Sequence, residues 1–200
     1  MQQQYGDVSV TLPGGFVAIC EIQRGPNNFF DQDLIKDLAD CFEDLDNNPE
    51  CRAIVLCSEG KHFCAGANFT SGARKDSVSS HGEGETNPLY GEAVRLFRCK
   101  TPVIAAVQGA AVGGGFGLAV MADFRVACSN TRMTANFVKL GFTPGFGLTH
   151  TLPRIIGVQK ANLLFMTGRR IDGQTAYDWG LADIFTDNDR VREVAIELAQ

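Results

Sequence analysis

The sequence predicts an α/β fold, because short apolar strands alternate with amphipathic helices along the chain. The clearest helical pattern covers residues 31–48, where apolar side chains recur at helical spacing and Asp31 can cap the first turn. Residues 51–58 and 101–107 are short and almost wholly apolar, as strands are when both faces of a sheet are covered. The length of 200 residues is enough for one domain with a proper core.

The other elements follow from the same local signals. Strands are expected over 7–12 and 124–128, and residues 14–22 are expected to form a turn and then a strand. A helix is expected after Asn87, which can cap it, because Pro88 fits the first helical position.

The chain is expected to form a single domain over residues 1–200, with no linker that would divide it. Its core covers 1–157, and a helical region begins at 158. The expected helices of that region cover 158–168, 172–180 and the residues from 190 onward. The last of these helices has no ending signal at residue 200, so the helical region is expected to be truncated there.

Composition excludes several classes of function. The net charge of −5, without a basic cluster, disfavours a nucleic-acid partner. Apolar runs fall short of the ~20 residues that a membrane helix needs, so no membrane partner is expected. The seven cysteines lie mostly in apolar runs and include no CxxC, so they are expected to be reduced, in a cytoplasmic protein without a metal site or disulfide frame.

The most informative stretch is "VQGAAVGGGFGLAVMADFRV", residues 107–126, with three consecutive glycines at 113–115. The run does not match a dinucleotide-binding fingerprint, because Leu118 occupies the position of the third glycine. It does not match a P-loop either, because no Lys-Ser/Thr pair follows. A tight strand-to-helix turn in a crowded core is one interpretation. The other is a ligand site, in which glycine leaves a backbone N–H open at a helix N-terminus, where negative charge is favoured.

A single amide of this kind would form half of an oxyanion hole. The second donor is expected from "FCAGANF", residues 63–69, another loop of small residues that follows a buried strand. Two N–H groups that converge on a thioester oxygen would stabilise an enolate or a tetrahedral oxyanion. Removing one such donor typically costs ~3–4 kcal/mol of barrier.

Three ordered motifs, "KHFCAGANF", "TPVIAAVQGAAVGGGFGLAVMADFRVA" and "GFTPGFGLTHTLPRIIG", resemble those of the crotonase, or enoyl-CoA hydratase/isomerase, superfamily. The resemblance implies a crotonase-like spiral of ββα units with C-terminal helices, assembled as a homotrimer or as a hexamer of two trimers. It implies an acyl-CoA or acyl-carrier-protein thioester as substrate, with no cofactor beyond the substrate's own CoA or phosphopantetheine. It assigns the oxyanion amides to Ala67 and Gly114.

The resemblance also implies a set of substrate-binding residues. The CoA side would be lined by two segments, namely Gly25, Pro26 and Asn27, and Cys64, Ala65, Gly66, Asn68, Phe69 and Thr70. The acyl pocket would be lined by Gly113, Phe116, Gly117, Asn136, Phe137 and Phe142, although the phenylalanines could equally be core residues. His150 is a candidate acid or base, with a core or interface histidine as the alternative interpretation.

Departures from the family pattern bear on the reaction. Hydratases of this family use two glutamates, and Gly117 and Phe137 stand at those positions here. Hydration therefore lacks an obvious acid and base, and decarboxylation or isomerisation is favoured. Residues 133–149 resemble the decarboxylating crotonase-like enzymes of polyketide β-branching clusters, although Phe69 replaces their loop lysine. A non-catalytic protein that binds acyl thioesters or serves assembly is the alternative.

Overall fold

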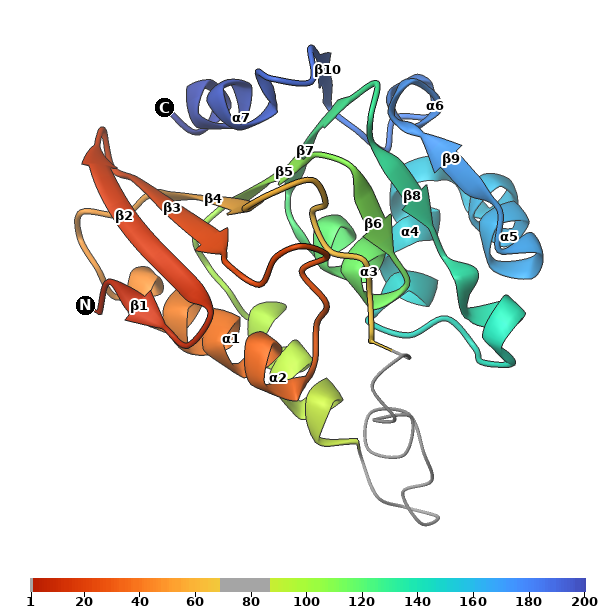
Figure 1. Cartoon of the computed structure of the whole chain (residues 1–200), viewed down its shortest axis with the longest axis horizontal. Helices are drawn as coiled ribbons and strands as arrows, with labels where there is room; N and C mark the ends of the chain where they lie inside the picture. The colour runs from red at the N-terminus through yellow and green to blue at the C-terminus, as the bar shows by residue number, and fades with distance from the viewer. Residues whose placement is uncertain (1, 69–86) are drawn as a thin grey trace.

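A twisted sheet forms the centre of the molecule (Figure 1). The computed structural model describes residues 2–68 and 87–200, and in this part of the chain the sheet has seven strands in the order β1-β2-β3-β4-β5-β7-β10. The first three strands pair antiparallel, and the pairs from β3 onward are parallel. The strands are β1 (Gln4–Tyr5), β2 (Val8–Gly14), β3 (Val17–Ile22), β4 (Ala53–Ser58), β5 (Val103–Val107), β7 (Phe124–Cys128) and β10 (Ile184–Thr186).

A second, smaller sheet lies beside the first (Figure 1). It consists of β6 (Ala110–Val112), β8 (Arg132–Thr134) and β9 (Arg170–Asp172). β6 pairs parallel with β8, and β8 pairs antiparallel with β9. The sequence analysis did not predict these strands, because three residues are too few to show an alternating pattern.

Seven α-helices and one 3-10 helix surround the sheets in the described ranges. They are α1 (Gln32–Asp46), α2 (Pro88–Leu96), α3 (Gly114–Met121), η2 (Asn136–Leu140), α4 (Leu148–Ile156), α5 (Val158–Thr167), α6 (Gly173–Asp178) and α7 (Val191–Ala199). The two predicted caps are confirmed: Asp31 accepts a hydrogen bond from the Leu34 N–H at 3.0 Å, and Asn87 accepts one from the Leu89 N–H at 2.9 Å. α4 was not predicted, because it has no side-chain cap and contains Pro153.

Both faces of the central sheet are covered, as the apolar strands predicted. Alternate residues of β4 enter two different clusters. Ile54 and Leu56 belong to the large core under α1, whereas Val55 and Cys57 pack with Val194 on the α7 side. Figure 1 shows α1 and α7 on opposite sides of the sheet. This agrees with the expected α/β class.

The expectation of a purely helical segment from residue 158 onward is wrong in one respect. β9 and β10 lie in this segment, β10 extends the central sheet beside β7, and α7 packs on β4, β5 and β7. The segment therefore contributes residues to both hydrophobic clusters of the sheet and is not a separate layer.

The cysteines are free, as predicted, and six of the seven are buried. In residues 2–68 and 87–200 no group of three or more His, Cys, Asp or Glu side chains could hold a metal ion. No helix within these ranges has the length and apolar content to cross a bilayer.

Candidate active site

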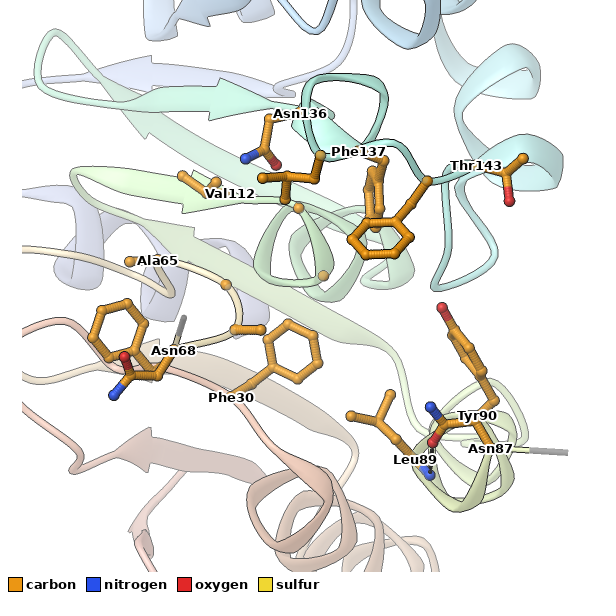
Figure 2. Close-up of a pocket in the computed structure, with 17 residues that line it drawn as sticks. Phe30, Ala65, Asn68, Asn87, Leu89, Tyr90, Val112, Asn136, Phe137 and Thr143 are labelled. Carbon is orange, nitrogen blue, oxygen red and sulfur yellow. Dashed lines mark hydrogen bonds between the residues drawn. The ribbon is translucent and has the colours of Figure 1, made fainter. Parts of the chain in front are cut away.

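A cavity of about 490 Å³ opens where β6 ends and α3 begins. Its walls come from five segments that are far apart in the sequence but meet in space (Figure 2). These segments lie within residues 29–30, 65–68, 87–90, 112–114 and 136–143.

Residues 63–68, the loop that follows β4, reach the cavity because their backbone is hydrogen-bonded to β6 and to the residues just before it. The Cys64 N–H donates to the Ala110 carbonyl, and the Cys64 carbonyl accepts from the Val112 N–H, each at 3.0 Å. The Phe63 N–H donates to the Gln108 carbonyl at 2.9 Å. These bonds fix the loop beside the chain that leads into the three glycines.

Glycine is required where this loop meets β6 and α3. Gly66 has φ +83°, and a Cβ on it would lie 2.6 Å from the carbonyl oxygen of Val112. A Cβ on Gly115 would overlap the carbonyl oxygen of Cys64. The absence of these two side chains lets the two backbones approach each other closely.

The structure places Ala67 and Gly114, the two expected oxyanion donors, in the walls of the same cavity. Gly114 is the first residue of α3, and Gly113 before it has φ 56° and gives no side-chain cap. Within the described chain, neither the Ala67 N–H nor the Gly114 N–H donates a hydrogen bond. Unpaired amides at a helix N-terminus attract a negatively charged oxygen, so this arrangement can bind an oxyanion.

A buried asparagine that the sequence analysis missed holds the loop before α1 in place. Asn28 is 0% exposed and accepts a hydrogen bond from the Arg24 N–H at 3.0 Å. Its side-chain amide donates to the carbonyls of Glu59 at 2.9 Å and His62 at 2.7 Å. Its φ of 48° is one that asparagine tolerates better than most residues. The doubled asparagine in "GPNNFF" was the available signal.

The predicted CoA-side residues of this loop lie near the cavity but do not line it. Gly25 donates its N–H to the Glu59 carboxylate at 2.8 Å, and a cis peptide joins it to Pro26. The Asn27 carbonyl accepts from the Ala65 N–H at 3.0 Å. The residues of this segment that do line the cavity are Phe29 and Phe30.

Several predicted pocket residues are indeed in the cavity wall. They are Ala65, Gly66, Asn68, Gly113, Asn136, Phe137 and Phe142. The side-chain oxygen of Asn136 lies over Gly113, since a Cβ on that glycine would be 3.2 Å from it. Phe69 and Thr70 lie outside the described residues.

Other predicted pocket residues are in the protein core instead. Phe116 is 0% exposed, belongs to the hydrophobic core and does not line the cavity. Cys64, within the loop, is equally buried, and burial raises the pKa of its thiol to about 12, so it is no nucleophile at neutral pH. His150 is exposed on α4 and is not among the residues that line the cavity.

Gly117, at the first hydratase glutamate position, does not line the cavity either. A Cβ on Gly117 would lie 2.6 Å from the Cβ of Phe146, which is 3% exposed. The Phe146 ring packs against Phe30 and Phe97, with ring centroids 6.1 and 6.0 Å apart. The space that a side chain on Gly117 would need is therefore filled by an aromatic cluster.

The cavity is mainly apolar over its described walls, with a few polar side chains and no charged ones. Asn68, Asn87, Asn136, Thr143 and Tyr90 supply its polar side chains, and none of the described lining residues is Asp, Glu, Lys, Arg or His. Tyr90 is the titratable group among them, and burial raises its pKa. Such a site suits an acyl group held by shape and by backbone amides.

The two sheets of Figure 1, the cavity lined by backbone amides between a loop and a helix, and the match to solved enoyl-CoA hydratase structures define a protein of the crotonase fold. The chain belongs to the enoyl-CoA hydratase/isomerase family, whose family model matches residues 14–200. The fold and the family expected from the three sequence motifs are thereby confirmed.

The names of similar proteins in this family refer to different reactions. A probable enoyl-CoA hydratase of Bacillus subtilis is 33% identical over 84% of this chain. The bacillaene synthase decarboxylase of the same organism is 32% identical over 96% of this chain. The crystal structure of an enoyl-CoA hydratase from Bacillus anthracis matches with a TM-score of 0.86 and 30% identity, over 96% of this chain. The chain spans 65% of the first of these proteins and 75% of each of the other two.

Proposed function

We propose that this protein is an enzyme that acts on an acyl-CoA or acyl-carrier-protein thioester by stabilising an enolate. The thioester oxygen would accept hydrogen bonds from the Ala67 and Gly114 amides. The observation that carries the proposal is that these two amides line one cavity and donate no hydrogen bond to any described residue. Preorganised donors of this kind lower the barrier because they bind the charge that develops in the transition state.

Decarboxylation or isomerisation is favoured over addition of water. Hydration needs one group to activate water and another to protonate carbon. Gly117 is packed under Phe146 and Phe137 is apolar, so neither family glutamate position supplies a carboxylate. The similarity to the bacillaene synthase decarboxylase supports a reaction of the decarboxylating kind.

The proposal includes the other properties that the family resemblance implies. These are a homotrimer or hexamer, a cytoplasmic location, and no cofactor apart from the CoA or phosphopantetheine of the substrate. Size-exclusion chromatography with light scattering on the full-length protein measures the first of these directly.

The alternative function is non-catalytic binding of acyl thioesters. The lack of charged side chains over the described cavity walls favours it. An open N–H at Gly114 distinguishes the two functions, since a binding or assembly protein has no need for an amide that stabilises an enolate.

The test compares Gly114→Pro with Gly114→Ala in the full-length protein. Both variants add a Cβ that meets the Phe30 ring, but only proline removes the N–H. Proline is tolerated at a first helical position, so the fold is expected to survive. The loss of kcat for proline relative to alanine is expected to be about 10²–10³-fold.

Activity is measured with a panel of crotonyl, 3-enoyl, malonyl-type and 3-methylglutaconyl thioesters, with products identified by mass spectrometry. Loss of CO₂ or double-bond migration, abolished by proline and retained with alanine, supports the proposal. Equal and measurable turnover by the two folded variants refutes the role of the Gly114 amide. Thioester binding without turnover of any substrate would favour the alternative.

A further inference from the structure

We propose that Tyr90 is the proton donor of this cavity and that its substrates are carboxylated acyl thioesters. The phenol would protonate the carbon that carries negative charge after CO₂ has left. This inference rests on the proposed function, because it needs an enolate in the cavity.

Tyr90 is held on a helix whose start is capped. Its N–H donates to the Asn87 carbonyl at 2.9 Å, in the first turn of α2. Farther along α2, Arg95 forms ion pairs with Asp40 at 2.6 Å and Glu43 at 2.7 Å, both on α1. The backbone that carries the phenol is thus fixed against the main body of the fold.

The phenol points from α2 into the cavity, toward the wall that carries Phe137 and Thr143 (Figure 2). Its oxygen lies against Gly145, because a Cβ on that glycine would overlap it. Glycine at this position makes room for the hydroxyl group.

Tyr90 has the properties of an acid that is ready to donate. Its hydroxyl forms no hydrogen bond with any described residue, so its proton is available to a bound ligand. Burial raises its pKa, so it keeps that proton at neutral pH. The side chain is 42% exposed, which lets solvent return a proton after each turnover.

The reaction balances with this one acid. The bond between the substrate carbon and its carboxylate breaks, CO₂ leaves, and the electron pair forms the enolate, whose oxygen is held by the two amides. The Tyr90 O–H bond then breaks as a C–H bond forms, and water reprotonates the phenolate. Hydration and isomerisation each need a base to remove a proton, whereas this sequence needs none.

The chemistry defines the substrate class. The leaving carboxylate must be attached where its electrons can reach the thioester carbonyl. That position is the α-carbon, as in a malonyl-type group, or the γ-carbon of an α,β-unsaturated acyl group. A salt bridge to the substrate carboxylate would stabilise the ground state and oppose loss of CO₂. The described cavity walls contain no charged side chain that could form one.

The test uses the full-length protein with Tyr90→Phe and, as a matched control, Tyr177→Phe. Tyr177 is 47% exposed on α6 and does not line the cavity. With methylmalonyl-CoA in D₂O, kcat of Tyr90→Phe is expected to fall at least ~10²-fold, as for loss of a general acid. The Kd for a non-reactive acyl-CoA is expected to stay within about twofold, because phenylalanine keeps the ring that lines the cavity and removes only the hydroxyl.

A second readout is the stereochemistry of protonation. The native protein and the control are expected to place deuterium on one face of the propionyl α-carbon, whereas Tyr90→Phe gives both faces. Gly145→Ala, which displaces the phenol, is expected to lower kcat in the native protein but to have little further effect in Tyr90→Phe.

Retention of kcat and of stereospecific labelling in Tyr90→Phe overturns the role of Tyr90. If Gly114→Pro is inactive in the same assay, the proposed function still stands. If the native protein decarboxylates none of the carboxylated thioesters but isomerises 3-enoyl-CoA, this inference is wrong and the proposed function is retained. Absence of any turnover refutes both.

Discussion

Gly66→Ala tests whether the close approach between residues 63–68 and β6 shapes the oxyanion site. A Cβ on Gly66 would lie 2.6 Å from the Val112 carbonyl oxygen, and the backbone there has φ +83°. Gly60→Ala is the matched control. Gly60 lies in the same connection with φ +70°, but a Cβ on it meets nothing within 4 Å.

The magnitude follows from two separate costs. A left-handed backbone costs a residue with a Cβ about 1–2 kcal/mol, and both variants bear that cost. Only Gly66→Ala adds overpacking against a backbone oxygen, which costs about 1–3 kcal/mol. We therefore expect Gly66→Ala to lose about 2–5 kcal/mol of unfolding free energy and Gly60→Ala about 1–2 kcal/mol.

The clash also acts on the site itself. Relieving this clash requires movement of Val112, which lies two residues before Gly114, or of the loop that contains Ala67. Displacing one oxyanion donor is expected to lower kcat about 10²–10³-fold, with little change for Gly60→Ala. Urea denaturation gives the free energies, and turnover of the best thioester gives kcat. Equal stability and equal kcat for the two alanine variants would refute this reasoning.

Two further predictions concern the missing glutamate and pH. Gly117→Glu is expected to gain no hydration of crotonyl-CoA and to lose about 1–3 kcal/mol, since Phe146 occupies the space; hydratase activity in this variant would contradict the packing argument. Burial would raise the pKa of Asp46, but hydrogen bonds from Thr101 and Lys100 outweigh it and lower that pKa. The Asp46 carboxylate therefore stabilises the fold above its pKa in the unfolded chain, which is ~3.9. That stabilisation is lost as the pH falls through the lower pKa of the folded protein. The stability difference from Asp46→Asn in urea should shrink below about pH 4, and a pH-independent difference would exclude this linkage.

The sequence predicted the elements whose signals are local. α1 has a clear apolar period and a cap at Asp31, and α2 has its cap and proline together. β4 and β5 are apolar on both faces. α4 was missed because it has no side-chain cap and contains Pro153. The three-residue strands of the second sheet were missed because they form only when distant segments pair with them.

Side-chain direction was the weaker part of the site prediction. In α3 every residue from Gly114 to Val120 is buried, so the helix has no polar face to show which side meets the cavity. Phe116 and Gly117 were therefore expected in the pocket, although both face the core. Tyr90 was overlooked, because nothing near it in sequence indicates that α2 crosses to the cavity.

By itself, the sequence predicted an open N–H in the run of glycines, because a missing Cβ and the start of a helix are both local properties, and the family resemblance assigned it to Gly114. Its motifs also identified the family. Only the tertiary structure decided which groups share a cavity with that amide. Phe146 filling the space beside Gly117, Asn28 joining two loops, and Tyr90 reaching Gly145 all depend on contacts between distant segments. Such contacts form when the whole core packs, and no local pattern encodes them.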